Sequence, residues 1–253
     1  MMEIITSRKN PLLQKIRQLS SGGRSVREKA GEYLGDGVKL LEEALKWDVP
    51  LTTVVVTPEI TPPALPAGVR LVQVPRDVME TISPMKTPQG ALFLAQLPST
   101  TPPQRLEGKR YLVLDGVQDP GNVGTIWRSA DALGADGLLL VNGCADPYSP
   151  KVVRATMGAC FRLPVWETTV EELEGLLKTS QIPLYATALR EDTVDVRQAD
   201  LGRAAVVIGS EGRGVSQALL DRAEQTVKIP MRERCESLNA ASAAVVVLWE
   251  MGK

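Results

Sequence analysis

Short hydrophobic blocks alternate with amphipathic stretches along the whole chain. In the first hundred residues, apolar runs rich in β-branched side chains predict strands, and apolar positions at helical spacing predict helices. The predicted strands are residues 53–57, 70–74 and 91–97, and the predicted helices are residues 37–47 and 77–82. This order of elements indicates a small α/β domain.

The same alternation continues after residue 108. Strands are predicted at residues 111–114, 137–141, 184–188 and 205–208, with a further short strand that closes at 229–231. Helices are predicted at 125–133, at 149–159, directly after the glycines of 209–214, and at 238–249, where nearly all side chains are apolar or small. This half is therefore expected to be a larger α/β domain.

A proline-rich segment separates the two halves. Residues 98–108 (PSTTPPQRLEG) contain three prolines and no apolar periodicity, which is the composition of a linker. Since 253 residues are enough for two ordinary domains, we expect one domain at 1–97 and the other at 109–253.

Composition narrows the chemistry. The chain has no histidine, which excludes hydrolases that rely on a serine–histidine or cysteine–histidine pair. The three widely spaced cysteines, Cys144, Cys160 and Cys235, predict reduced thiols and no metal site. The N-terminus lacks an apolar signal, and no apolar run approaches the ~20 residues of a membrane span. We therefore expect a cytoplasmic protein without bound metal.

Positive charge is concentrated near the N-terminus. The whole chain has a net charge of −1, but residues 1–30 carry seven basic and two acidic side chains, a local net charge of +5. This segment either contacts RNA phosphates or forms a solvated arm. The candidates for RNA contact here are Arg8, Lys9, Lys15 and Arg17.

Two turns in the second half follow predicted strands. Strand 205–208 runs into a glycine-rich turn at 209–214 (GSEGRG), and Ile229-Pro230-Met231 is followed by Ser237-Leu238-Asn239 before a small-residue helix. Glycines let a ligand approach the main chain closely, and ligands of parallel α/β sheets bind at the carboxyl ends of strands. Taken singly, the same residues could form an ordinary turn and a helix start capped by Ser237. In this order they resemble the second and third motifs of the SpoU/TrmH family of RNA ribose 2′-O-methyltransferases.

Another motif follows strand 111–114. The sequence DPGNVGTIWRSADALGA resembles the first SpoU motif, in which an asparagine and an arginine six residues later are functional; here these are Asn122 and Arg128. Asn122 could instead be the cap of the following helix. Arg128 lies about 200° around that helix from Ile126, away from its apolar stripe.

The resemblance implies the fold and the cofactor. It implies an α/β trefoil-knot (SPOUT) methyltransferase domain, a homodimer through that domain, and S-adenosyl-L-methionine as cofactor. The catalytic residues that it implies are Arg128, Asn122, Glu211, Ser237 and Asn239. The cofactor contacts that it implies are Thr187, Ala188, Gly209, Ser210, Gly212, Ile229, Met231, Ser237, Leu238 and Asn239.

The first half resembles a known RNA-binding domain. The patterns at 33–39, 83–85 and 88–90 are similar to the L30e/L7Ae-like substrate-binding domain of many SpoU enzymes. Family members often have glutamate where this chain has Asp36. A segment that flanks the active site in the family adds Lys151 and Arg154 as candidate RNA contacts, although a plain surface helix would explain them equally well.

Arg128 has two conceivable roles. Family mechanisms assign it as the base that deprotonates the ribose hydroxyl, but neutralising a guanidinium at pH 7 costs on the order of 8 kcal/mol. We therefore expect Arg128 first to stabilise the developing alkoxide and to anchor an RNA phosphate.

Three alternatives stand beside this hypothesis. A dinucleotide-binding dehydrogenase is disfavoured because neither glycine turn has GxGxxG spacing. A catalytically silent RNA-binding protein would not need all five catalytic candidates. Among RNA substrates, 23S ribosomal RNA is expected, with transfer RNA as the alternative; DNA lacks the 2′-hydroxyl.

Overall fold

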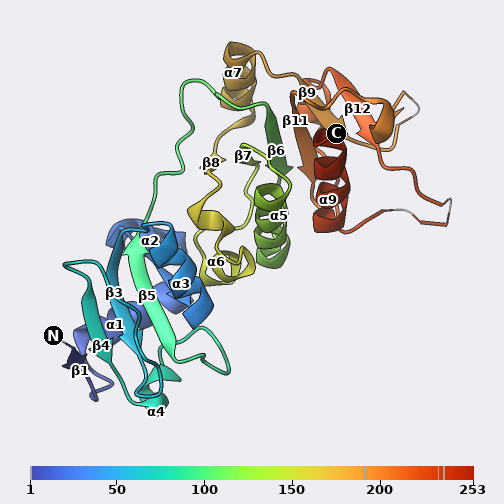
Figure 1. The fold of residues 1–253 in the computed structure, drawn as a ribbon. Helices are drawn as coiled ribbons and strands as arrows, with labels where there is room; N and C mark the ends of the chain where they lie inside the picture. Colours follow the sequence, from blue (N-terminus) through green and yellow to red (C-terminus); the bar gives the residue numbers. More distant parts are fainter. Residues whose placement is uncertain (1, 191, 233, 236) are drawn as a thin grey trace. The chain divides into compact units, whose positions relative to one another are not determined.

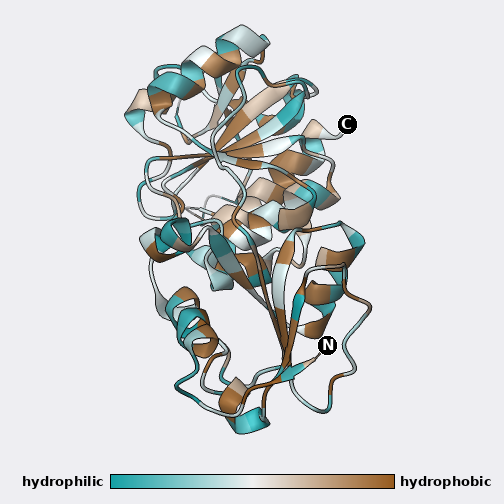
Figure 2. Ribbon diagram, turned by 90° about the vertical axis from the view of Figure 1, so that its left-hand side faces the viewer, coloured by the Kyte–Doolittle hydropathy of each residue, from teal (hydrophilic) through white to brown (hydrophobic). Residues whose placement is uncertain are grey.

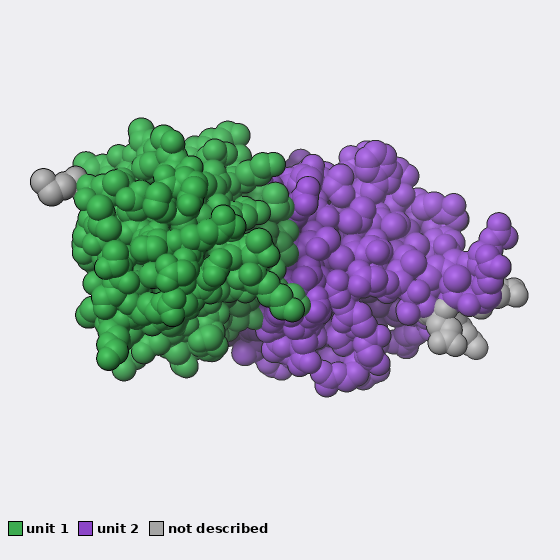
Figure 3. Space-filling model, turned by 90° about the horizontal axis from the view of Figure 1, so that it is seen from below, with its two compact units in different colours: residues 1–98, 146–161 green, residues 99–145, 162–253 purple. Residues whose placement is uncertain are grey.

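The structure is a computed structural model that describes residues 2–190, 192–232, 234–235 and 237–253. It divides into two compact units, coloured separately in Figure 3. Unit 1 comprises residues 1–98 and 146–161, and unit 2 comprises residues 99–145 and 162–253. The chain thus leaves unit 1 at the predicted linker, but residues 146–161 are grouped with unit 1 and not with the rest of 109–253.

Unit 1 is built on a mixed five-stranded sheet with the strand order β1-β4-β3-β5-β2 (Figure 1). Strands β1, β4 and β3 are parallel, whereas β5 runs antiparallel to both β3 and β2. The strands are Glu3–Ile4 (β1), Glu32–Asp36 (β2), Leu51–Val56 (β3), Arg70–Gln73 (β4) and Ala91–Gln96 (β5). The helices are Pro11–Ser21 (α1), Arg24–Ala30 (α2), Val38–Lys46 (α3) and Arg76–Met79 (α4).

The basic N-terminal segment is not a solvated arm. It forms α1, which begins at the side-chain cap Asn10 with Pro11 in the first turn, and α2. The apolar face of α1 is buried in the core of unit 1. Its buried residues are Leu12, Leu13, Ile16 and Leu19. The arm interpretation was wrong because it weighed the charges and overlooked this apolar face.

Residues 146–161 pack with the rest of unit 1. Arg27 is a residue only 3% exposed, and its guanidinium donates to the Asp146 carboxylate and to the carbonyls of Leu19 and Gly22. The rings of Tyr33 and Tyr148 lie 5.1 Å apart between centroids. The helix predicted over 149–159 is shorter, Pro150–Ala155 (α6), because Met157 and Gly158 adopt positive φ values of 50° and 91°. A 3-10 turn, Ala159–Phe161 (η1), follows.

Unit 2 contains a seven-stranded parallel sheet with the strand order β10-β12-β9-β11-β6-β7-β8. The strands are Arg110–Asp115 (β6), Gly137–Val141 (β7), Val165–Glu167 (β8), Leu184–Thr187 (β9), Val194–Asp195 (β10), Ala204–Gly209 (β11) and Gln225–Lys228 (β12). The helical elements are Pro120–Ala132 (α5), Val170–Ser180 (α7), Val196–Gln198 (η2, a 3-10 turn), Gln217–Leu220 (α8) and Ala240–Met251 (α9). The helix expected after the glycine-rich turn is therefore only the four-residue α8.

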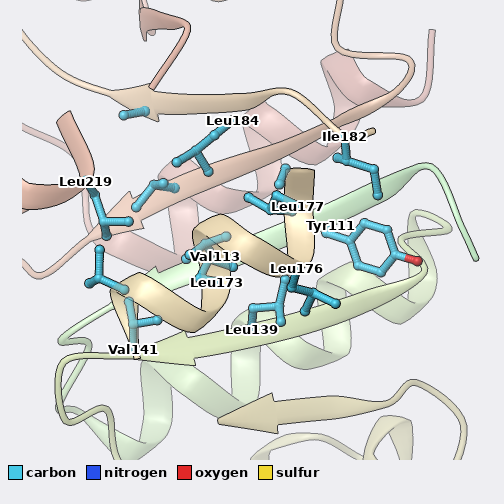
Figure 4. Packing of buried hydrophobic residues seen from close by; sticks show 14 of the residues in the cluster. Tyr111, Val113, Leu139, Val141, Leu173, Leu176, Leu177, Ile182, Leu184 and Leu219 are labelled. Atoms are coloured by element: carbon cyan, nitrogen blue, oxygen red, sulfur yellow. The ribbon is translucent and has the colours of Figure 1, made fainter. Parts of the chain in front are cut away.

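Side chains that alternate along the strands form the core of unit 2. Tyr111 and Val113 of β6 face α7, whose residues Leu173, Leu176 and Leu177 complete a buried cluster (Figure 4). Helix α7 was not predicted, although it begins with a capping box between Thr169 and Glu172. Helix α9 packs against α5 and β11. Figure 2 shows hydrophobic colouring along much of the strands, as expected for buried parallel strands.

Candidate active site

A cavity of about 430 Å³ lies where three neighbouring strands of unit 2 end. Thr187 ends β9, Gly209 ends β11, and Lys228 ends β12, and all three residues line the cavity. Ala240 and Ala243, at the start of α9, lie on its wall. Ligands of parallel α/β sheets bind at this edge, and the volume is within the usual range of small-molecule sites, roughly 300–1,000 Å³.

Most residues predicted to contact the cofactor line this cavity. They are Thr187, Ala188, Gly209, Ser210, Ile229, Met231, Ser237 and Leu238. Two predicted contacts, Gly212 and Asn239, are not among the lining residues. Glu236, at the start of the third motif, lies outside the described residues.

The glycine-rich loop after β11 folds back on itself. Ser210 and Gly214 exchange two main-chain hydrogen bonds, of 3.2 and 2.8 Å. A Cβ at position 209 would lie 2.1 Å from the carbonyl carbon of Gly214, and Gly214 has a φ of +66°. Glycine is therefore required at 209 by the close approach and favoured at 214 by the backbone conformation.

Three predicted catalytic residues form one hydrogen-bonded chain. The Asn122 amide of α5 donates to the Glu211 carboxylate in the glycine-rich loop. The Asn239 amide donates in turn to Asn122 Oδ1 over 3.1 Å. Three segments far apart in the sequence are thus joined beside the cavity, whose wall includes Glu211.

Two helix caps differ from the expected ones. Asp119 caps α5, with Oδ1 accepting from the Asn122 main-chain N–H, so Asn122 is not the cap. Asn239 caps α9, with Oδ1 accepting from the N–H groups of Ala241 and Ser242, so Ser237 is not the cap. The side chain of Asn122 is consequently available to Glu211 and Asn239.

Arg128 is not brought to the cavity within this chain. Six residues at about 100° each place it about 240° around α5 from Asn122. Its side chain is exposed, is absent from the cavity wall, and has no hydrogen bond or ion pair among the described residues.

Sequence reasoning missed three cations at the cavity. Among the described residues, Arg190, Arg213 and Lys228 line it, as does the carboxylate of Glu211. Their signal was positional, because Lys228 is the last residue of β12 and Arg190 follows β9 by three residues.

The candidate RNA contacts in unit 1 are mostly engaged with other protein groups. Arg8 pairs with Asp77 and Lys15 with Glu32, while Arg17 donates to the carbonyls of Arg8 and Thr81. Arg154 contacts the Met85 sulfur, and Lys151 also has a partner. Lys9 is exposed.

The described residues contain neither a membrane-spanning helix nor a metal-binding cluster. No helix among them is long and apolar enough to cross a bilayer. No group of three or more Cys, Asp or Glu side chains in the same part of the chain is arranged to hold a metal ion.

Comparison with protein families decides the identity of the chain. Residues 109–249 match the SpoU rRNA Methylase family, and residues 10–92 match the MRM3-like substrate binding domain. The chain belongs to the SpoU rRNA methylase family. The predicted family is confirmed, and the dehydrogenase alternative is wrong.

Relatives of this SpoU protein match over nearly its full length. The Bacillus subtilis (strain 168) protein named 23S rRNA (guanosine(2553)-2′-O)-methyltransferase RlmP is 30% identical, and the match covers 99% of both chains. The Streptomyces viridochromogenes protein named 23S rRNA (uridine(2479)-2′-O)-methyltransferase is 32% identical over 97% of this chain and 90% of that protein.

A solved structure has the same fold. The crystal structure of an AdoMet-bound rRNA methyltransferase from Sinorhizobium meliloti aligns with a TM-score of 0.87 and 31% identity, over 99% of this chain and 97% of that one. The predicted α/β fold of a SpoU methyltransferase with an N-terminal substrate-binding domain is confirmed. The trefoil knot stays a prediction.

Proposed function

We propose that this SpoU protein transfers the methyl group of S-adenosyl-L-methionine to a ribose 2′-hydroxyl of ribosomal RNA. The observation that carries the proposal is the cavity at the ends of β9, β11 and β12, bordered by the Asn122–Glu211–Asn239 chain. The AdoMet-bound S. meliloti structure, with the same fold, supports the choice of cofactor.

The cofactor is proposed to occupy the cavity, held mainly by main-chain groups of the strand ends and of Leu238. The lining there is largely apolar, which suits an adenosine ring and a methionine chain. When bound, S-adenosyl-L-methionine supplies an activated methyl group on a sulfonium. The protein then has to align the ribose hydroxyl and assist the loss of its proton.

Arg128 is proposed to stabilise the developing alkoxide and to anchor a neighbouring phosphate. Its exposed guanidinium is available to RNA. Because Arg128 is absent from the cavity wall of its own chain, we further propose that it acts in a homodimer, at the site of the partner subunit.

The dimer is proposed to form through α9. Val245 and Trp249 are 39% and 61% exposed and lie four residues apart, on one side of this helix. Trp249→Asp should yield monomers in light scattering at micromolar concentration, whereas Trp47→Asp, at a similarly exposed tryptophan of unit 1, should not. A monomeric wild-type protein would contradict the dimer.

Ribosomal RNA is favoured over transfer RNA as substrate. Two relatives that match over nearly the whole chain are named as 23S rRNA methyltransferases, one for a guanosine and one for a uridine. The two named targets share the ribose but differ in the base, so we propose that the base is recognised by RNA contacts outside the cofactor cavity. We propose that unit 1 makes these RNA contacts, since residues 10–92 match a substrate binding domain. We also propose that the protein acts in the cytoplasm.

The activity is tested with the full chain and labelled cofactor. Transcribed 23S rRNA, transfer RNA and a DNA copy are incubated separately, and 2′-O-methyl nucleosides are quantified by mass spectrometry. Methylation of 23S rRNA alone is the expected result. Methylation of transfer RNA alone would transfer the proposal to that substrate, and cofactor binding without methylation of any RNA would favour the catalytically silent alternative.

A further inference from the structure

Asp115, the last residue of the central strand β6, is a buried carboxylate that lies outside the cavity wall. Its side chain belongs to a residue only 4% exposed. Asp115 Oδ1 accepts from the Asn142 side-chain amide over 2.6 Å, and Oδ2 accepts from the Ser216 main-chain N–H over 2.6 Å. Each oxygen therefore has a different donor, one from the end of β7 and one from the far end of the glycine-rich loop.

Asp115 lies beside both ends of the glycine-rich loop. In the parallel register, Asp115 is opposite Gly209, where the loop begins. Through Ser216 it also binds the residue where the loop ends. Between these two points the loop is closed by the Ser210–Gly214 hydrogen bonds. The cavity residues between Gly209 and Ser216 are Ser210, Glu211, Arg213, Gly214 and Val215.

Asn142 is held in a geometry that serves Asp115. It follows β7 directly and has a φ of +55°, a conformation that asparagine adopts more readily than most residues. From there its Nδ2 reaches Asp115 and lies 3.4 Å from Ser216 Oγ. The ends of β6, β7 and the loop are thus joined in one polar contact.

We propose that Asp115, oriented by Asn142, is a positioning residue that holds the 209–216 loop in the shape that receives S-adenosyl-L-methionine and presents Glu211 to Asn122. This inference rests on the proposed placement of the cofactor in the cavity. A carboxylate suits the task because it accepts two hydrogen bonds at fixed directions and has no donor of its own. The Asn142 amide and the Ser216 N–H therefore have a single arrangement around Asp115. Because Ser216 is fixed in this way, the loop is ordered before the cofactor binds.

Exchanging the two side chains tests the proposal in the full-length protein. Asn142→Asp alone places a second carboxylate against that of Asp115, and the repulsion between them should open the loop. Asp115→Asn alone retains an oxygen for Ser216 and should have a smaller effect. The double variant Asp115→Asn/Asn142→Asp restores a donor facing a carboxylate, keeps the oxygen for Ser216, and has the same net charge as the wild type.

The readouts are the dissociation constant of S-adenosyl-L-methionine by calorimetry and amide hydrogen exchange of residues 210–216 without cofactor. We expect Asn142→Asp to weaken cofactor binding by about tenfold or more, with faster exchange of the loop, and the double variant to recover to within about threefold of the wild type. The kcat at saturating cofactor should change less than the KM for the cofactor.

Asp136 supplies the matched control. Like Asp115 it accepts two hydrogen bonds, but both come from main-chain N–H groups, those of Lys109 and Arg110, to Oδ2, and they lie at the opposite end of β6. Asp136→Asn should lower stability without changing cofactor affinity. If Asn142→Asp binds the cofactor like the wild type, or if the double variant is no better than Asn142→Asp, the proposal for Asp115 is wrong.

Ala243→Phe, on the cavity wall, separates this inference from the proposed function. If it leaves cofactor affinity unchanged, the placement of the cofactor in the cavity is wrong. If it abolishes binding while Asn142→Asp binds normally, the placement holds and only the role of Asp115 is wrong.

Discussion

Asn122 and Glu211, 89 residues apart in the sequence, are joined by a hydrogen bond from the amide of Asn122 to the carboxylate of Glu211. Asn122 lies in α5 and Glu211 in the loop after β11, so this bond connects the first motif to the second. Asn239 extends the connection to the third motif. The three motifs recognised separately in the sequence therefore meet in one polar group.

Removing the Glu211 carboxylate should impair catalysis. A hydrogen bond to a charged group contributes about 1.5–3 kcal/mol, so Glu211→Ala should reduce kcat/KM by roughly ten- to hundredfold. Glu211→Gln keeps an oxygen for Asn122 and should lose much less. Glu224→Ala, at an exposed acidic residue outside the cavity, is the control. Equal losses for the alanine and glutamine variants would contradict an accepting role of Glu211.

Variants of Arg128 distinguish a stabilising cation from a base. Arg128→Lys keeps the charge without the planar fork, so some activity should survive, whereas Arg128→Ala should lose far more. If Arg128 instead acts as a neutral base, the rate of the lysine variant should climb steeply with pH, since lysine is easier to deprotonate. Single-turnover methylation at saturating cofactor, across roughly pH 6 to 10, separates these outcomes. A lysine variant as inactive as alanine, with RNA and cofactor bound, would indicate that guanidinium geometry is essential.

Two glycine variants should behave oppositely. Gly209→Ala forces a Cβ to within 2.1 Å of the Gly214 carbonyl carbon, so the loop has to move and cofactor affinity should fall by about tenfold or more. Gly175→Ala, inside α7 with no atom within 4 Å of the added Cβ, should raise stability by about 0.5–1 kcal/mol and leave the affinity unchanged. Calorimetry and urea denaturation measure the two effects. A Gly209→Ala protein with normal affinity would contradict a tightly folded loop.

Asp36 should make stability depend on pH. Burial raises the pKa of this carboxyl, against smaller opposing effects of Ser83 and Arg154. The folded state therefore disfavours ionisation, and stability falls as pH rises from the ordinary range of an aspartate toward neutrality. Asp36→Asn can still accept from Ser83 and should be more stable than the wild type at pH 7. The difference should vanish below about pH 3, where both the folded and the unfolded carboxyl are largely protonated. Urea denaturation midpoints of the wild type and of Asp36→Asn, at pH 7 and at acid pH, test the sign of this effect. A variant less stable than the wild type at pH 7 would contradict it.

The cysteines should differ sharply in reactivity. Burial raises the pKa of the Cys144 thiol to about 11, so it stays protonated at pH 8. Cys235 is exposed and Cys160 is buried. Iodoacetamide at pH 8 should modify Cys235 first, and Cys144 only after denaturation. Peptide mass spectrometry of the wild type and Cys235→Ser measures this order, and rapid labelling of Cys144 in the folded protein would contradict its raised pKa.

Regular segments were predictable, and segments defined by distant contacts were not. The apolar block at 205–208 was recognised as a strand because β-branched residues and glycines mark it directly. Strand β2 was missed because its sequence, EYLGD, has only two large apolar residues, and its burial comes from pairing with β5. The motifs identified Asn122 and Asn239. The residue that caps each helix could not be predicted, because the sequence places the first residue of a helix only to within a few positions.

The position of Arg128 and the grouping of residues 146–161 could not be predicted. Spacing in the motif gave the identity of Arg128, but its orientation away from the cavity follows from how α5 packs. The ion pair of Arg27 and Asp146 joins residues 119 positions apart, and nothing in their local sequences indicates it. Sequence patterns report local periodicity, whereas these features result from tertiary contacts.

The grouping of residues 146–161 with unit 1 has a consequence for synthesis on the ribosome. Unit 1 is complete in sequence only at residue 161, which is 63 residues after its first segment ends at residue 98. At about 5–20 residues per second, the 119 positions from Arg27 to Asp146 take roughly 6–24 seconds to synthesise, and throughout that time Arg27 lacks its partner carboxylate. The N-terminal half therefore emerges with a cation whose counter-ion has not yet been made, and unit 1 is completed only while the second unit is being made.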